Sequence, residues 1–204
     1  MIIFFHGYGS TSGDKAAALN AAVVAAGGEP IIAPRYANAD EYFAAIDDAC
    51  ALLKNRTDPI ALVAGSSMGG FAAYVVARRC SAMGVLSNPC LRPWDRLPLH
   101  GEDDWARRAR EAFDALPPDD SNVGLRAIIN KDDELFGDTF EADLDALNIH
   151  SITRFPHGGH RSANWSEEIV PEIVAEFKSM AHTARCLAAV RDYDLNRAAA
   201  IGVA

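Results

Sequence analysis

The chain has 204 residues, of which 50% are hydrophobic and 23% are charged, a composition typical of one compact globular domain. Its 19 Lys and Arg residues stand against 28 Asp and Glu residues. The resulting net charge of −9 argues against nucleic acid or a membrane as a partner, because phosphate backbones and anionic lipids would be repelled. The four cysteines form no Cys-x-x-Cys pair and the N-terminus lacks the pattern of a signal peptide, so we expect free thiols and a cytoplasmic protein.

Short apolar runs alternate with alanine-rich segments of helical spacing, which is typical of a parallel sheet with helices on both faces. Strands are predicted over residues 2–5, 30–33, 60–64, 83–87, 125–129 and 151–155. Helices are predicted over residues 15–26, 40–54, 68–80, 139–147 and 166–180. We therefore expect an α/β fold with a mostly parallel sheet of about six strands.

The connection over residues 91–124 departs from this alternation because it is long and rich in charge, proline and tryptophan. Within it, residues 102–116 predict an amphipathic helix, which is either a small cap over the sheet edge or a surface helix packed on the core. Trp94 of this insertion is a candidate substrate-binding residue in an apolar roof. After a domain of residues 1–182, residues 183–204 predict a further helix that docks either on its own domain or on a second subunit, so a homodimer is left open.

The sharpest motif is Gly65-Ser66-Ser67-Met68-Gly69, which comes directly after one predicted strand and directly before a predicted helix. A serine on such a tight turn projects its hydroxyl above the sheet, and the glycines on either side let strand and helix approach closely. The positive end of the helix then favours negative charge at the serine. The pattern makes Ser67 a candidate nucleophile.

A nucleophilic serine needs a base, normally histidine, to accept its proton. His160 is the candidate, because it follows the last predicted strand in a glycine-containing loop over residues 156–160. His157 in the same loop is the alternative.

The imidazole in turn needs a carboxylate, and the chain order expected for a nucleophile on such a turn is serine, acid, histidine. The loop after the strand at 125–129 contains Asp132, Asp133 and Glu134. We take Asp133 as the acid and Asp132 as the alternative; the remaining interpretation is an acidic turn that caps the next helix.

Stabilising the oxyanion of a tetrahedral intermediate requires two aligned N–H groups. Met68, after the nucleophile, supplies one. Gly7 after the first strand lets the backbone turn so that Tyr8 supplies the other, and Gly7 itself would border the substrate. No metal-ligand cluster and no phosphate-binding glycine loop occur, so no metal and no cofactor are predicted.

Five segments together resemble the YqiA-type small bacterial esterases of the α/β-hydrolase superfamily, over residues 2–180: His6-Gly7, Gly65 to Gly70, Ser87-Asn88-Pro89, Asp133-Glu134 and Gly158-Gly159-His160. The resemblance implies a compact α/β-hydrolase fold that acts on short acyl esters or thioesters. It also implies that Ser67, Asp133 and His160 match the family's nucleophile, acid and base, and that Asn88 belongs to a loop lining the site. The tryptophan-containing insertion and the C-terminal tail depart from the family's pattern.

These observations predict a serine hydrolase that cleaves carboxylic esters or thioesters of a small molecule through an acyl-enzyme. A peptidase or a C–C bond hydrolase would use the same triad. The alternative that is not an enzyme is a non-catalytic binding module with this fold.

Overall fold

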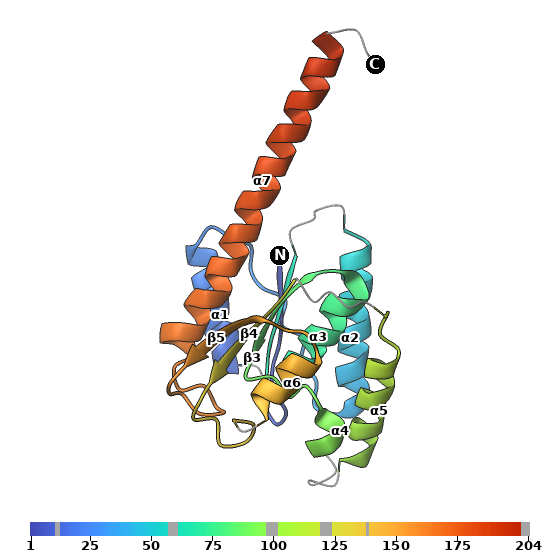
Figure 1. Cartoon of the computed structure of the whole chain (residues 1–204), viewed down its shortest axis with the longest axis vertical. Helices are drawn as coiled ribbons and strands as arrows, with labels where there is room; N and C mark the ends of the chain where they lie inside the picture. Colours follow the sequence, from blue (N-terminus) through green and yellow to red (C-terminus); the bar gives the residue numbers. More distant parts are fainter. Residues whose placement is uncertain (11–12, 57–60, 97–101, 119–123, 138, 201–204) are drawn as a thin grey trace.

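The computed structural model describes residues 1–10, 13–56, 61–96, 102–118, 124–137 and 139–200. Its centre is a parallel sheet with the strand order β1-β2-β3-β4-β5 (Figure 1). The strands are β1 (Ile2–Phe5), β2 (Leu62–Ser66), β3 (Met83–Ser87), β4 (Leu125–Asn130) and β5 (Ser151–Phe155). Because all of these strands run the same way, their carboxyl ends meet at one edge of the sheet, where open α/β sheets bind their ligands.

The strand predicted over residues 30–33 is reduced to a single parallel bridge between Ile3 and Ile32. The Phe4 N–H donates to the Ile32 carbonyl at 2.8 Å, and the Ile32 N–H donates to the Ile2 carbonyl at 2.9 Å. Pro30 and Pro34 flank this bridge, and proline has no N–H with which to extend a ladder. The segment therefore touches the edge of the sheet beside β1 without forming a full strand.

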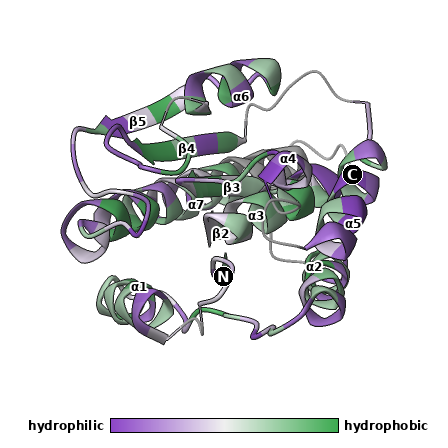
Figure 2. Ribbon diagram, turned by 90° about the horizontal axis from the view of Figure 1, so that it is seen from below, coloured by the Kyte–Doolittle hydropathy of each residue, from purple (hydrophilic) through white to green (hydrophobic). Residues whose placement is uncertain are grey.

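Helices cover both faces of the sheet, as Figure 2 shows. On one face lie α1 (Gly13–Ala25) and α7 (Val170–Ala200), the latter preceded by a π-helical turn, η2 (Trp165–Ile169). On the other lie α2 (Ala39–Lys54), α3 (Met68–Cys80), α4 (Pro93–Arg96), α5 (Asp103–Asp114) and α6 (Phe140–Ala146). Successive side chains of each strand point to opposite faces of the sheet. In β1, Ile2 and Phe4 pack in the core between the sheet and α1 and α7, while Ile3 and Phe5 pack in the core on the opposite face.

The insertion forms α4 and α5, and α5 packs on the helical layer beside α2. The Trp105 ring lies 4.9 Å from that of Tyr42, and the Arg108 guanidinium lies 4.6 Å from the Phe43 ring. Trp94 packs between Phe71 and Phe113 in the same layer, with ring centroids 6.2 and 5.0 Å away. The amphipathic helix thus buries its apolar side on the core, as a surface helix does.

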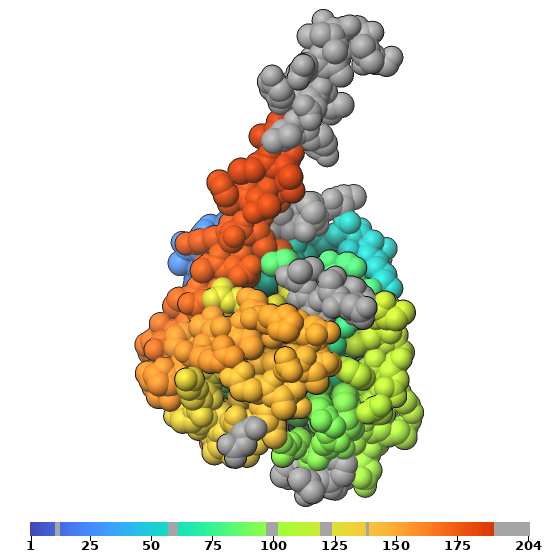
Figure 3. Space-filling view, viewed as in Figure 1, coloured from blue at the N-terminus to red at the C-terminus, as the bar shows by residue number. Residues whose placement is uncertain are grey.

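The helix α7 runs without interruption from Val170 to Ala200, so the predicted break between a helix ending at residue 180 and a separate tail helix is wrong. No glycine or proline occurs between residues 172 and 200 to end it. Its first turns carry buried side chains, whereas Leu187 is 65% exposed, and the helix rises out of the body of the molecule (Figure 3). No helix in the described part of the chain is both long and apolar enough to cross a membrane.

Candidate active site

Ser67 occupies the turn between β2 and α3 in a backbone conformation that side chains rarely adopt, with φ 56° and ψ −121°. Such a conformation is costly for a residue other than glycine and persists only where the surroundings impose it. Here the Ser67 N–H donates to the Ser87 carbonyl of β3 at 3.0 Å, and the Ser67 carbonyl accepts the Gly70 N–H at 2.8 Å and the Cys90 N–H at 3.0 Å. These bonds hold the turn from both sides.

The two glycines of the motif are required by close backbone packing. A Cβ atom at Gly65 would lie 1.9 Å from the Gly69 carbonyl oxygen, and one at Gly69 would lie 2.1 Å from the Phe5 carbonyl oxygen. Both distances are far inside van der Waals contact. Helix α3 can start directly behind Ser67 only because these positions lack side chains.

His160 reaches Ser67 from the loop after β5. Its Nε2 lies 2.9 Å from the Ser67 Oγ, and the edge of its ring meets the Phe136 ring at 4.9 Å between centroids. The alternative, His157, points elsewhere: its Nε2 lies 3.6 Å from a Glu168 oxygen, and its side chain is 65% exposed. The structure therefore brings His160 to Ser67, and His157 stays outside the pocket.

Asp133 lies behind the imidazole and is fully buried. Its Oδ2 accepts from the His160 Nδ1 at 2.8 Å, while its Oδ1 accepts the N–H groups of Leu135 and Phe136, both at 2.8 Å. Three hydrogen bonds fix the carboxylate in one orientation. The contact with Asp133 holds the ring with its Nε2 facing Ser67.

The neighbouring acidic side chains hold the histidine loop by its backbone. Asp132 accepts the N–H groups of Gly158 and Gly159 at 3.1 and 2.8 Å, and Glu134 accepts the His160 N–H at 2.9 Å. This last bond lowers the pKa of Glu134. The sequence showed this acidic cluster, but spacing alone could not tell which carboxylate binds the ring and which bind the backbone.

Asn88 supports the same loop from beneath. It is fully buried, and its amide donates to the Gly159 carbonyl at 3.1 Å and to the Ser162 Oγ at 3.2 Å. Its Oδ1 accepts the Asn130 N–H at 2.8 Å, and the Asn130 amide donates to the same Gly159 carbonyl at 3.0 Å. The structure places Asn88 below the pocket rather than in its wall. Asn130 was not singled out from the sequence, although it begins the acidic loop.

The predicted oxyanion residues border Ser67. A Cβ atom on Gly7 would lie 3.2 Å from the Ser67 Cβ, so the loop after β1 passes directly beside Ser67. Gly7, Tyr8 and Met68 all line the same pocket. The Tyr8 hydroxyl donates to Glu102, and its ring meets Trp105 edge-on, which ties this loop to α5.

The pocket has a volume of about 990 Å³. Lys15, Arg96, Arg161 and Trp165 contribute to its wall, but Trp94, which packs in the helical layer, does not. Cys90 also lines the pocket, and burial raises the pKa of this thiol to about 12, so it stays protonated and is a poor nucleophile.

Within the described residues, no three His, Cys, Asp or Glu side chains gather as metal ligands.

Comparison with known proteins identifies both a family and a fold. The model of the Uncharacterised protein family (UPF0227) matches residues 1–103, which include the Ser67 turn but end before Asp133 and His160. No curated protein matches the sequence.

Solved structures resemble this chain over most of its length. A candidate hydrolase of the α/β superfamily from Xanthomonas campestris pv. campestris aligns with a TM-score of 0.61 at 18% identity, over 87% of this chain and 96% of that one. Est1E from Butyrivibrio proteoclasticus gives 0.63 at 14% identity, over 89% and 88%. An esterase from Pyrobaculum calidifontis gives 0.58 at 19% identity, over 88% and 76%. The chain therefore has the α/β-hydrolase fold.

Proposed function

This chain belongs to the uncharacterised protein family UPF0227, and from that premise and its fold we propose that it is a serine hydrolase cleaving carboxylic esters or thioesters of a small molecule. The observation that carries the proposal is the unbroken chain of hydrogen bonds from Ser67 to Asp133. The Ser67 Oγ lies 2.9 Å from the His160 Nε2, and the His160 Nδ1 lies 2.8 Å from the Asp133 Oδ2. This is the arrangement of a nucleophile, a general base and the acid that orients the base.

In the proposed reaction, the Ser67 Oγ attacks the carbonyl carbon while the His160 Nε2 takes its proton. The tetrahedral intermediate collapses when the imidazolium gives that proton to the departing alcohol or thiol, leaving an acyl group on Ser67. A water molecule, deprotonated by His160, then attacks the acyl-enzyme. This second intermediate collapses as the imidazolium returns its proton to the Ser67 Oγ, which releases the carboxylic acid and restores the enzyme. Asp133 keeps its negative charge throughout and stabilises the imidazolium.

The negative oxygen of each intermediate needs donors beside Ser67. We assign these to the backbone N–H groups of Met68, the first residue of α3, and of Tyr8. Support for Met68 comes from the position of Ser67 at the positive end of this helix, and support for Tyr8 from the close passage of Gly7 over Ser67.

The test compares hydrolysis of para-nitrophenyl esters and acyl thioesters of graded chain length by the wild-type protein, by Ser67→Ala, and by Ser179→Ala as a matched control on the exposed surface of α7. We expect Ser67→Ala to lose turnover by roughly a thousandfold or more while its circular dichroism spectrum stays unchanged. Equal turnover in Ser67→Ala and wild type would overturn the proposal.

The alternatives give different results in the same assay. Faster cleavage of amides or β-diketones than of esters would favour the peptidase or the C–C bond hydrolase. A folded protein that cleaves none of these substrates would favour the binding module.

A further inference from the structure

Three cationic side chains line the pocket around Ser67: those of Lys15, Arg96 and Arg161. Among the described residues none of the three forms an ion pair, although many arginines elsewhere on this chain do. Among the described residues that line the pocket, the one acidic side chain is that of Asp14, which is exposed. A pocket with this excess of positive charge is unexpected in a protein whose net charge is −9.

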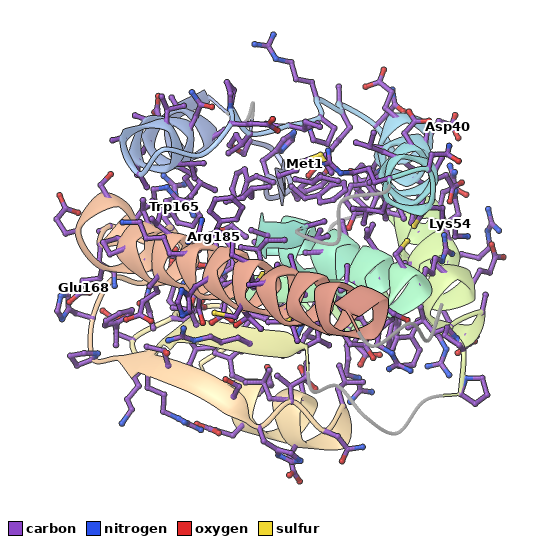
Figure 4. All side chains as sticks on the ribbon, turned by 90° about the horizontal axis from the view of Figure 1, so that it is seen from above. Met1, Asp40, Lys54, Trp165, Glu168 and Arg185 are labelled. Carbon is purple, nitrogen blue, oxygen red and sulfur yellow. The ribbon has the colours of Figure 1, made fainter. Side chains whose placement is uncertain are left out.

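Lys15 is the cation held most firmly beside the nucleophile. Its Nζ donates to the Ser66 Oγ at 2.9 Å, on the residue directly before Ser67, and lies 4.9 Å from the centre of the Trp165 ring. The Trp165 Nε1 in turn donates to the Lys15 carbonyl at 3.0 Å, where α1 meets η2 and where Figure 4 labels Trp165. The ammonium group is therefore directed to the floor of the pocket.

Such a position is costly without an anion. Burying an ammonium group removes its hydration, and a hydroxyl and an aromatic face replace only part of that loss. Accordingly, burial lowers the pKa of Lys15 to about 8. An anionic group of a bound substrate would supply the missing partner, and the surrounding low-dielectric walls would strengthen the attraction.

We propose that the pocket binds substrates bearing an anionic group, a carboxylate or a phosphate, and that Lys15 is the residue that recognises this group. The inference rests on the proposed serine hydrolase function, since it names the substrate class of that site. Arg96 and Arg161 add to the positive field. Arg96 is partly engaged, because its Nη2 donates to the Thr139 Oγ1 at 3.2 Å and its guanidinium lies 5.6 Å from the Phe136 ring.

The experiment measures how fast two fluorophosphonates of equal chain length label Ser67, one ending in a methyl group and the other in a carboxylate. We expect wild type to react faster with the carboxylate probe, despite its own negative charge. In Lys15→Met the ratio of the two rates should fall roughly 10- to 100-fold, the effect of one charge-assisted hydrogen bond. Lys15→Arg should restore part of the ratio.

Lys54→Met is the matched control. Lys54 is exposed at the end of α2, and Figure 4 shows it on the side of the molecule away from Trp165. We expect this variant to keep the wild-type ratio. A ratio unchanged in Lys15→Met would overturn the proposal, because a merely structural lysine would slow both probes alike.

Failure of the enzyme proposal looks different, because then neither probe labels Ser67. Ester pairs locate the anion within the substrate. A charge on the acyl side is tested by para-nitrophenyl hemisuccinate against the butyrate, and one on the leaving group by para-carboxyphenyl butyrate against its methyl ester. The pair whose ratio falls in Lys15→Met identifies the side that Lys15 contacts.

Discussion

At the scale of single residues, three consecutive carboxylates in the site make different contacts. Asp133 binds the imidazole, whereas Asp132 and Glu134 bind the backbone of the loop that carries it. The sequence predicted the serine, the histidine and the acidic loop, because each follows a strand of the parallel sheet. It could not assign the carboxylates, since adjacent residues in a turn point in different directions according to backbone angles that spacing does not encode.

The two aspartates of this loop provide a matched test, since each can lose its charge without losing its shape. Asp133→Asn should lower kcat by roughly a thousandfold or more, because an amide cannot stabilise the imidazolium and favours the wrong tautomer. Asp132→Asn should lower kcat only about tenfold, through looser positioning of the loop. The measurement is kcat for ester hydrolysis by the two variants. Equal losses of kcat would contradict the different roles proposed for Asp133 and Asp132.

Lys15 makes the stability of the protein depend on pH in a predictable direction. Its pKa of about 8 in the folded protein lies below the ordinary value of 10.5, so between these values the unfolded chain holds a proton that the folded protein has released. Raising the pH through this window therefore favours the folded state.

The comparison with Lys15→Met isolates this contribution. The free energy of unfolding of wild type, relative to the variant, should rise by about 1 kcal/mol in total between pH 8 and pH 10.5, allowing for partial exposure of the side chain. Urea titrations at several pH values measure it. A difference that falls with pH would contradict the desolvation of Lys15.

At the scale of elements, periodicity predicted the strands at 2–5, 83–87 and 151–155 with the bounds that the structure has. It failed at residues 30–33, where the apolar run is genuine but the flanking prolines prevent a ladder. Periodicity also predicted two helices where the structure has one continuous α7. The amphipathic pattern weakens past residue 180, and a weaker pattern is easily read as the end of a helix even where no residue breaks it. Hydrophobic periodicity shows which segments form the strands of the sheet. Where a strand or a helix ends depends instead on local backbone chemistry, such as the presence or absence of proline and glycine.

The turn between β2 and α3 should be the least tolerant part of the fold. Gly69→Ala would press a methyl group against the Phe5 carbonyl, 2.1 Å away, and should lower the free energy of unfolding by about 3 kcal/mol. Gly13→Ala is the control: its added Cβ meets no atom within 4 Å, and the change should stay within about 0.5 kcal/mol. Urea titrations measure the free energy of unfolding of both variants. Equal values for Gly69→Ala and Gly13→Ala would contradict the prediction.

At the scale of the whole molecule, the described side chains of α7 divide into two groups. Ile173 and Val174 are buried in the core on the α1 side of the sheet, whereas the side chains described beyond residue 184 are exposed. We propose that residues 1–182 form the hydrolase domain and fold without the remainder of the helix.

A chain ending at residue 182 should therefore keep its free energy of unfolding within about 0.5 kcal/mol of the full chain. Urea unfolding tests this, and light scattering on both chains tests whether the helix joins two subunits. A truncated chain that fails to fold, or loses several kcal/mol, would show that the end of α7 is part of the domain.

Labelling with a neutral fluorophosphonate, followed by mass spectrometry of the digested protein, tests most directly whether His160 and Asp133 activate Ser67. This reaction reports on the nucleophile without any assumption about the substrate. We expect one adduct, on Ser67, that is absent from Ser67→Ala and forms far more slowly in His160→Ala. An adduct on Ser66 instead, or no adduct on a protein shown to be folded, would contradict it.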